Sequence, residues 1–321
     1  MPTWLKHGLK FLIGGGGIYL LIHSGALNPT LVGKALTESP LFCLAGFLSY
    51  ALIVVLPAWL RWFLLIRQAG LKPKASQTFS LHMIGIFFNS LIPGGTGGDL
   101  IKGFYLYRHH EAKDKSRALT SIVMDRFVGL YALLLVAMIM IALNVSLWKN
   151  NPSLAFTCFF YLGVFCTFTV AIGFFFSPFF SSLNRFLGNP KRKKIPGLNI
   201  LQSLFNSMLI YKKNPSGLLL TVGIGMIVDG GLILMYYFFA QALGVTLALP
   251  AHGFVVPTLT MINGIPISPS GLGVGEVAGS FIYKQLGVSQ GSEILALVHI
   301  CVMVMSLFGI PFYFLYRHKT K

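Results

Sequence analysis

Residues 93–99 interrupt a long apolar segment with the sequence PGGTGGD. The segment runs from about residue 78 to residue 107, long enough to form a continuous helix. Proline removes a backbone donor and glycine favours open backbone, so the interruption cannot be regular helix. Non-helical backbone at membrane depth survives only when it is buried in protein or lines a wet cavity. The sequence therefore predicts a broken helix inside a larger bundle.

A second apolar segment, residues 252–287, is broken in the same way by NGIPISPSGLGVGE at residues 263–276. Six other apolar segments are continuous, and each is long enough to cross a bilayer core of about 30 Å. They cover residues 11–27, 41–66, 118–147, 154–177, 215–243 and 292–316. We therefore expect an all-α polytopic membrane protein with six full transmembrane helices and two re-entrant, broken-helix segments.

The composition excludes a soluble globular chain. Apolar residues make up 55% and charged residues only 10% of the 321 residues, and the mean hydropathy is +0.74. One core could not hide that much apolar surface from water, whereas lipid accepts it. The net charge of +17 would also suit a nucleic-acid-binding protein, but the basic residues form short clusters between apolar runs. That distribution is typical of the cytoplasmic face of a membrane protein, so we expect no nucleic-acid partner.

The basic residues also decide whether the broken segments cross the membrane or turn back. If both turn back, 19 Lys and Arg residues lie on one side, in loops 1–10, 67–77, 108–117, 181–214 and 317–321. The other side then holds only Lys34 and Lys149 in its loops. If both segments crossed, 11 of the 19 would move outside, against the positive-inside rule. We therefore predict re-entry in a multi-pass protein of the bacterial inner (plasma) membrane, with both termini cytoplasmic.

The order of the segments predicts an internal repeat. Segments that start near residues 41, 78 and 118 each have a counterpart 174 residues later, near 215, 252 and 292. Each trio reads span, broken segment, span, and the two broken segments would open from opposite sides. We expect a single membrane domain over residues 1–321, with inverted repeats at about 11–147 and 154–316. In transporters, such repeats place the substrate site at their interface.

A basic linker, residues 181–214, carries the run KRKK at residues 191–194. Apolar residues follow at helical spacing, namely Leu198, Leu201, Leu204, Phe205 and Met208. This pattern predicts an amphipathic cytoplasmic helix on the inner leaflet, near anionic headgroups. A solvated charge run that only fixes the topology would explain the basic residues equally well.

Four acidic residues lie inside membrane segments, where ionisable groups are costly and usually functional. They are Asp99, Asp125, Asp229 and Glu276. Asp99 and Glu276 each close a glycine-rich run and open a half-helix, so both could serve only as helix caps. Capping does not explain the flanking glycines, whose free N–H groups at a helix N-terminus suit a phosphate. The candidate substrate-binding residues at the two tips are Gly94, Gly95, Gly97, Gly98, Asp99, Lys102, Gly271, Gly273, Gly275 and Glu276.

Asp125 and Arg126 complete the candidate substrate site. Adjacent residues point to different helix faces, so these two charges do not simply neutralise each other. The planar guanidinium of Arg126 matches phosphate oxygens. An arginine that snorkels to the interface, with Asp125 as its local partner, would fit the same position. We interpret the pair Arg61-Trp62, near the inner end of its span, as an interfacial anchor.

Asp229 and His299 are candidates for coupling to an ion gradient, because both lie in apolar segments and could carry protons. Asp229 has no partner nearby in the sequence. His82 has the same character, although a buried histidine more often has a structural role. No Ser-His-Asp, metal-ligand or cofactor-binding arrangement is visible, so we expect no catalytic residue, no metal and no cofactor.

The broken segments and the spans beside them resemble a known family. The runs that carry the resemblance are RWFLL at 61–65, FFNSLIPGGTGGDLIK at 87–102, SIVMDRFVGL at 121–130 and PISPSGLGVGE at 266–276. In this order they resemble the lysylphosphatidylglycerol synthase transmembrane region family, over nearly the whole chain.

The resemblance implies a membrane domain that can precede a soluble aminoacyltransferase and is linked to moving aminoacylated phospholipid between leaflets. Other family members stand alone or accompany glycosyltransferases for lipid-linked sugars. This chain differs at Lys102, where an arginine is common, and at Asp125, where a glutamate is common. Its 321 residues also hold no synthase domain. The resemblance therefore does not carry over the substrate or lysyl transfer.

From these observations we expect a lipid flippase-like transporter for a phosphate-containing lipid, a phospholipid or a lipid-linked precursor with an anionic headgroup. A small-solute or ion secondary transporter would fit the same repeat. A non-transporting accessory subunit of a lipid-modifying glycosyltransferase would also fit, and it would need that enzyme as a partner. An enzyme is the least expected class. No nucleotide-binding motif is present, so the energy would come from ion gradients or downhill flow.

Overall fold

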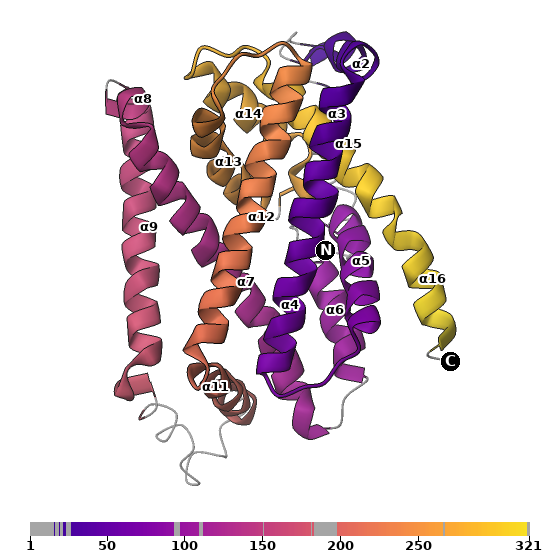
Figure 1. Ribbon diagram of the computed structural model, residues 1–321, viewed down its shortest axis with the longest axis vertical. Coiled ribbons are helices and arrows are strands. Elements are labelled where there is room, and N and C mark those ends of the chain that lie inside the picture. Colours follow the sequence, from indigo (N-terminus) through magenta and orange to yellow (C-terminus); the bar gives the residue numbers. More distant parts are fainter. Residues whose placement is uncertain are drawn as a thin grey trace.

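The structure is a computed structural model that describes residues 27–92, 97–108, 112–149, 151–180, 198–265 and 267–319, with residues 16, 19, 22, 23 and 182. These residues form a bundle of helices, and none of them belongs to a strand (Figure 1). The prediction of an all-α polytopic membrane protein is confirmed.

Five helical stretches of the described chain are long and apolar enough to cross a membrane. They are α3–η1–α4 (Pro40–Leu48, Ser49–Val55, Leu56–Gln68), α7 (Ala112–Leu143), α9 (Pro152–Phe176), α12 (Pro215–Ala242) and α15–α16 (Gly291–Leu307, Gly309–Lys319). They coincide with five of the six continuous spans that the sequence predicts. The sixth, residues 11–27, lies almost entirely outside the described residues.

The starts of three helices follow from one local pattern, an asparagine followed by a proline. Asn28 begins the short helix α2 (Pro29–Glu38), and its Oδ1 accepts a hydrogen bond from the backbone N–H of Thr30 at 3.0 Å. Asn151 and Asn214 cap α9 and α12 in the same way. The asparagine satisfies an orphan donor, and the proline has no N–H to satisfy and a preset φ. The sequence thus marks where these helices begin.

Both broken segments fold back as helical hairpins (Figure 1). The first consists of α5 (Ala75–Leu91) and α6 (Gly97–Arg108) and lies in the lower half of the view. The second lies in the upper half and consists of α13 (Leu249–Asn263), the single turn η3 (Pro269–Gly271) and α14 (Val274–Lys284). Neither hairpin extends over the whole length of the bundle, in contrast to α12.

The tips of the two hairpins touch near the middle of the molecule. The hydroxyl of Ser270 donates a hydrogen bond to the backbone carbonyl of Asn89 at 3.2 Å. Ser270 adopts a φ of 50°, and Gly271 and Gly273 adopt φ values of 80° and 78°. These left-handed angles explain why glycine occupies two of the three positions in this turn.

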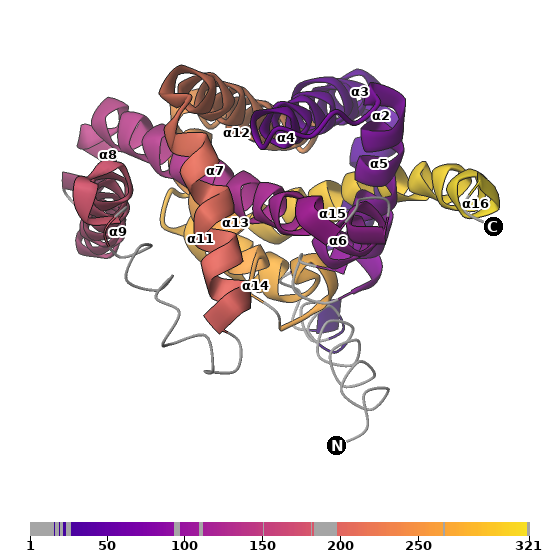
Figure 2. The same ribbon diagram turned by 90° about the horizontal axis from the view of Figure 1, so that it is seen from below.

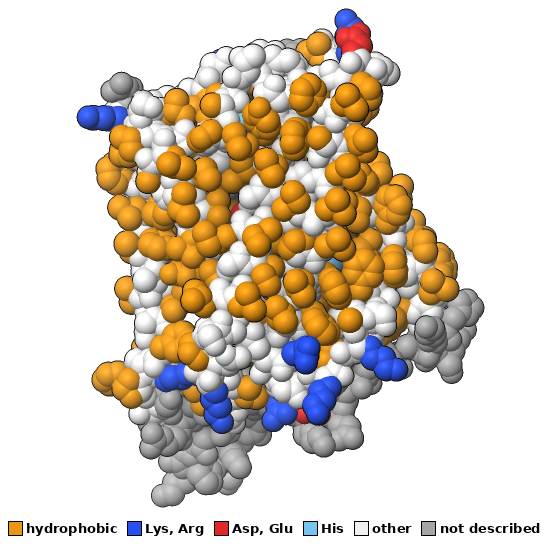
Figure 3. All heavy atoms as spheres, in the orientation of Figure 1, with side chains coloured by type: hydrophobic (Ala, Val, Ile, Leu, Met, Phe, Trp, Pro, Cys, Tyr) orange, Lys and Arg blue, Asp and Glu red, His pale blue; other side chains and the backbone are white. Residues whose placement is uncertain are grey.

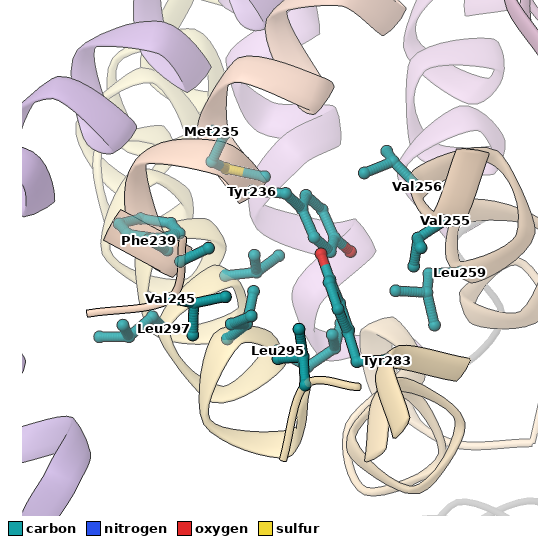
Figure 4. Close-up of a cluster of buried hydrophobic side chains, with 14 of the residues drawn as sticks. Met235, Tyr236, Phe239, Val245, Val255, Val256, Leu259, Tyr283, Leu295 and Leu297 are labelled. Atoms are coloured by element: carbon teal, nitrogen blue, oxygen red, sulfur yellow. The ribbon is translucent and has the colours of Figure 1, made fainter. Parts of the chain in front are cut away.

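The main apolar core lies where α12 packs against the second hairpin and α15. Figure 4 shows side chains from α12, α13, α14 and α15 meeting in one buried cluster. Its labelled members are Met235, Tyr236, Phe239, Val245, Val255, Val256, Leu259, Tyr283, Leu295 and Leu297. α12 also packs against α3, η1, α4 and α7, and Figure 2 shows it beside α3 and α4.

The lower end of the bundle carries the amphipathic helix α11 (Leu198–Lys212), which packs against α7. Tyr211 is fully buried there, and its hydroxyl donates a hydrogen bond to the carbonyl of Leu65 at 3.0 Å. A helix therefore forms where the spacing predicts one. The basic run at residues 191–194 lies outside the described residues.

The surface has the character of a membrane protein. Figure 3 shows a broad apolar band around the middle and basic side chains gathered at the lower end. The helix α9 presents most of its side chains outward, and its buried residues are Leu154, Cys158 and Tyr161. Such a surface is stable in lipid and not in water. The inverted relation of the two halves, and the division at about residues 147 and 154, stay predictions.

The basic lower end predicts a topology that labelling can test. In a chain freed of its own cysteines, single cysteines in residues 108–117 and 181–214 should resist an impermeant thiol reagent added outside intact cells. A cysteine at Lys149, in the opposite loop, is the control and should react. Reaction of either basic loop as fast as position 149 would contradict the re-entrant topology.

Candidate functional site

Charged side chains from α4, α6 and α7 form ion pairs inside the bundle. Arg61 of α4 donates from Nε to Oδ1 of Asp125 on α7 at 2.8 Å. Asp99, in the first turn of α6, accepts from Lys102 Nζ at 3.3 Å and from Arg126 Nε of α7. Asp125 therefore points toward α4, whereas its neighbour Arg126 points toward α6.

Arg61 lies within the bundle, so the interpretation of Arg61-Trp62 as an interfacial anchor was wrong. The side chain of Arg61 is only 12% exposed, and Trp62 is fully buried. Two glycines leave room for the guanidinium, because a methyl group on Gly129 would lie 3.0 Å from Arg61 Nη1 and one on Gly225 would lie 3.4 Å from it. A buried arginine requires a carboxylate partner, and Asp125 supplies it.

Asp229 of α12 belongs to the surroundings of this pair. It is buried, and its Oδ2 has no hydrogen-bond partner within the described part of the chain. Arg61 is the charged group that interacts with it electrostatically. Arg61 is therefore close enough to interact with both Asp229 and Asp125, and it is hydrogen-bonded to Asp125.

Lys102 turns toward the interior of the first hairpin. Its side chain is 7% exposed, and Nζ lies 5.2 Å from the centre of the Trp62 ring, in a cation–π contact. Gly85 on α5 leaves the space for its aliphatic stem, since a methyl group there would lie 2.2 Å from Lys102 Cε. Lys102 thus neutralises Asp99 from within and does not line the groove described below.

The tip of the first hairpin is held by Asn89. Its Oδ1 accepts a hydrogen bond from the backbone N–H of Gly98 at 2.7 Å. That N–H is therefore not free for a phosphate, in contrast to the sequence-based expectation for Gly98. Gly97 packs against Ile92, and Gly94 and Gly95 lie outside the described residues.

A groove of about 840 Å³ lies between α6 and α7 and opens at the surface of the bundle. Among the described residues, those that line it and carry a charge are Asp99 and Arg126. The remaining lining residues are Leu100, Gly103, Phe104, Leu119, Ile122, Val123, Phe127 and Leu130. The side chain of Arg126 is 53% exposed, in contrast to the buried Arg61 and Lys102. The groove therefore combines apolar walls with one charged spot, formed by Asp99 and Arg126.

The second glycine tip holds Glu276 in a different environment. Glu276 Oε2 accepts from the backbone N–H of Gly273 at 2.7 Å, which caps α14. Its Oε1 lies 2.6 Å from His299 Nδ1 on α15. Gly271 and Gly275 pack against Asn263. None of these residues lines the α6–α7 groove, so the structure does not bring the second tip onto Arg126.

Sequence reasoning missed the roles of Arg61, Asn89 and Asn263. Two features of the sequence could have indicated a buried Arg61. It is a charged residue within an apolar run, and Gly129 and Gly225 on later helices leave space for its guanidinium. Asn89 precedes a glycine-rich break, where an amide side chain can bond backbone groups, as it does with Gly98. Asn263 lies at the start of the other break and packs against Gly271 and Gly275. Among the described residues, no group of three or more His, Cys, Asp or Glu side chains is placed to hold a metal ion.

The close approach of the first hairpin's arms makes Gly98 sensitive to substitution. A methyl group there would lie 2.0 Å from the Gly85 carbonyl oxygen, and backbone cannot move aside as a side chain can. We expect Gly98→Ala to lower stability by about 1–3 kcal/mol. The measurement is the apparent melting temperature of the purified protein. Gly163→Ala on α9, where no atom lies within 4 Å of an added methyl group, is the control. Equal melting temperatures for both variants would contradict the packing.

Comparison with known proteins agrees with this architecture. The family described as the lysylphosphatidylglycerol synthase TM region matches residues 9–311. A UPF0104 membrane protein of Pyrococcus horikoshii is 22% identical in an alignment of 313 positions that covers 89% of each chain. A UPF0104 membrane protein of Methanocaldococcus jannaschii is 26% identical over 241 residues, 74% of this chain and 97% of that protein. No solved structure matches this chain. The chain belongs to the lysylphosphatidylglycerol synthase transmembrane region family.

Proposed function

We propose that this protein moves a phosphate-containing lipid, a phospholipid or a lipid-linked precursor, between the leaflets of the bacterial inner membrane. The observation that carries the proposal is the α6–α7 groove, with its apolar walls and one charged spot. A lipid divides in the same way into apolar chains and a charged headgroup. Membership of a membrane-domain family named for phospholipid synthesis supports a lipid as the substrate. The proposal assigns no chemical step to the protein.

Arg126 is the proposed phosphate ligand. Its side chain is half exposed in the groove, where Asp99, its ion-pair partner, is the other charged lining residue among those described. Arginine presents a planar fork of donors that matches two phosphate oxygens. On binding, the phosphate would take the place of Asp99 beside Arg126. Lys102 would then keep the Asp99 carboxylate neutralised, because it is bonded to the other carboxylate oxygen.

The walls of the groove suit the acyl chains. Leu100, Phe104 and Phe127 are each at least half exposed. In a bilayer these side chains face hydrocarbon, so the chains of a bound lipid need not leave the membrane. The headgroup alone would then pass the polar residues at the middle of the bundle.

The hairpin tips are the proposed gate for the headgroup. Asp99 opens α6 at the first tip, and the Ser270–Asn89 hydrogen bond closes the two tips on each other. Movement of the headgroup past the middle of the bundle would require that bond to open. The glycines of both tips would allow the backbone to rearrange.

A small-solute or ion transporter would need a polar cavity enclosed within the protein. The α6–α7 groove has two charged residues among its ten lining residues and opens at the apolar surface, which favours a lipid. An accessory subunit of a lipid-modifying enzyme would bind lipid but would not move it alone. The experiment below separates the three functions.

The test uses the purified chain in vesicles of phosphatidylglycerol and phosphatidylethanolamine that contain a trace of fluorescent phosphatidylglycerol. An impermeant reductant bleaches the label in the outer leaflet only. We expect the bleached share to rise with the amount of protein, above that of protein-free vesicles. An unchanged share contradicts the proposal. Uptake of radiolabelled inorganic phosphate by the same vesicles would then indicate a solute transporter, and label movement only with a lipid-modifying enzyme added would indicate an accessory subunit.

A further inference from the structure

Glu276 and His299 form a buried acid–base pair in the second half of the chain. Their side chains are 2% and 4% exposed, and Nδ1 of His299 lies 2.6 Å from Oε1 of Glu276. The other carboxylate oxygen accepts from the Gly273 N–H. Among the described residues, no lysine or arginine is paired with either side chain. The pair must therefore balance its own charge.

The proton count of such a pair is restricted. With one shared proton the pair is neutral overall, whichever of the two groups carries it. A second proton makes it a cation, and loss of the shared proton leaves an unpaired carboxylate in the protein interior. Unpaired buried charge is strongly disfavoured, so the pair can gain or lose at most one proton at a time. Exchange of one proton is the chemistry that this site can perform.

Two polar atoms beside the pair have no partner. The buried His299 Nε2 and Asn263 Oδ1 lack a hydrogen bond within the described residues. Both side chains pack against Gly275, where an added methyl group would lie 2.5 Å from Asn263 Oδ1 and 2.9 Å from His299 Cε1. A role limited to capping α14 explains the bond between Glu276 and Gly273. It does not explain a buried histidine with an open nitrogen next to an unused amide oxygen.

Other titratable side chains surround the pair. On α12, Tyr236 interacts electrostatically with Glu276. Figure 4 shows the hydroxyls of Tyr236 and Tyr283 pointing toward each other. Tyr283 OH lies 2.9 Å from His252 Nδ1 on α13. His252, Tyr283 and Tyr236 thus form a row of polar groups in the apolar core, which extends from the start of α13 toward Glu276. Other titratable groups lie on the elements that pack against α14 or α15. They include Lys34 and Glu38 of α2, His82 of α5, Asp229 and Tyr237 of α12, Tyr313 and Tyr316 of α16, and Lys284, Glu293 and Cys301 of α14 and α15 themselves.

A short series of contacts joins the pair to the proposed lipid site. Glu276 fixes the N–H of Gly273 in the turn that contains Ser270. Ser270 bonds the Asn89 carbonyl, and the Asn89 side chain bonds the N–H of Gly98. The next residue along α6 is Asp99, the partner of Arg126. A change at Glu276 that moves its turn would therefore act directly on the contact between the two tips.

We propose that Glu276 and His299 form a proton-binding site whose protonation drives the gate at the hairpin tips, so that lipid movement is coupled to a proton gradient. The coupling rests on the proposed lipid transport, whereas the proton site does not. Both oxygens of the Glu276 carboxylate already contact nitrogen groups, those of His299 and Gly273, whereas a metal cation needs oxygen ligands, so the site favours a proton over sodium.

The proton site is tested on the purified chain without lipid transport. Infrared difference spectra between acidic and neutral pH should show a protonated-carboxyl band that is absent in Glu276→Gln and shifted in His299→Gln. Glu293→Gln is the matched control, because Glu293 is equally buried but is bonded to the N–H of Asn28 and the hydroxyl of Ser292. A band that is unchanged in both Glu276→Gln and His299→Gln would overturn the site.

The coupling is tested in the fluorescent-lipid vesicles described above. One unit of pH difference across the wild-type vesicles should change the rate of label movement by up to about tenfold, the ratio of the proton activities. His299→Gln should show the same rate with and without the gradient. A wild-type rate that ignores the pH gradient, or follows a sodium gradient instead, would overturn the coupling. A Glu276-dependent band without any lipid movement would leave the proton site standing and contradict the proposed lipid transport.

Discussion

Arg126→Lys should slow lipid movement in vesicles by about tenfold, and Arg126→Gln by about a hundredfold. The structure places the Arg126 guanidinium at the charged spot of an apolar groove, bonded to Asp99. Lysine keeps the charge but loses the planar fork, which removes one charge-assisted hydrogen bond of about 1.5–3 kcal/mol. Glutamine removes the charge as well, so the phosphate would lie against Asp99 without a counter-charge. Each 1.4 kcal/mol corresponds to tenfold in rate.

Arg67→Lys and Arg67→Gln are the matched controls for this series. Arg67 lies in the last turn of α4, exposed and over the ring of Phe63, outside the groove. Both control variants should transport like the wild type. If Arg126 only snorkelled to the interface, lysine would replace it without loss. Wild-type rates for Arg126→Lys and Arg126→Gln, in protein with an unchanged size-exclusion profile, would show that the phosphate is not held by Arg126.

Arg61→Met is expected to destabilise the protein by about 3–5 kcal/mol, because it leaves the buried carboxylate of Asp125 without its partner. For a chain of this size the apparent melting temperature should fall by on the order of 10 °C. Asp229, which Arg61 also faces, increases the cost of removing the cation. The double variant Arg61→Met/Asp125→Leu should recover most of the loss, since no unpaired charge remains.

Arg117→Met gives the matched control for a salt bridge of the same residue types. Arg117 bonds Asp114 at 3.3 Å near the start of α7, with side chains 41% and 22% exposed. An exposed pair contributes about 0–1 kcal/mol, so the melting temperature should barely change. Equal effects of Arg61→Met and Arg117→Met would contradict a buried role for Arg61. Failure of the double variant to recover would indicate that Arg61 stabilises the bundle by packing rather than by its charge.

The helices were predictable because bilayer thickness and backbone chemistry act locally. A continuous apolar run of sufficient length in a membrane favours a helix, and five such runs form helices that are long and apolar enough to cross a bilayer. The helix breaks were also predicted from local sequence, since proline and glycine disfavour a continuous helix. The predicted bounds of 93–99 and 263–276 were too wide, however, because α6 begins at Gly97 and α14 at Val274. The three asparagine–proline pairs mark helix starts for the same reason.

The partners of the charged residues were not predictable, because they come from helices far apart in the sequence. Arg61 and Asp125 are separated by 64 positions, and Asp99 and Arg126 by 27. From the sequence alone, Arg61 fits an anchor at the membrane surface as well as a buried ion pair. The inward direction of the Lys102 side chain was not predictable for the same reason, because the space that it fills is left by Gly85 on another helix. Depth and direction depend on packing that spacing does not reveal.

The two glycine tips illustrate the difference between composition and environment. Both are glycine-rich runs followed by an acidic residue in the first turn of a helix. At the first tip the acid meets Lys102 and Arg126 beside a groove, whereas at the second it meets His299 in the core. Similar runs of residues therefore led to a single predicted role, and the structure separates them into two sites.

Photo-crosslinking within the groove tests the central claim most directly. A benzoylphenylalanine in place of Phe104 lies in the groove wall, and one in place of Phe159 on α9 lies on an exposed apolar surface outside it. After irradiation in membranes, mass spectrometry counts phospholipid adducts at each position. We predict more phosphate-containing adduct at position 104 than at 159, and its loss on Arg126→Gln at position 104 only. Equal adduct at both positions, unaffected by Arg126→Gln, would contradict a lipid-phosphate site between α6 and α7.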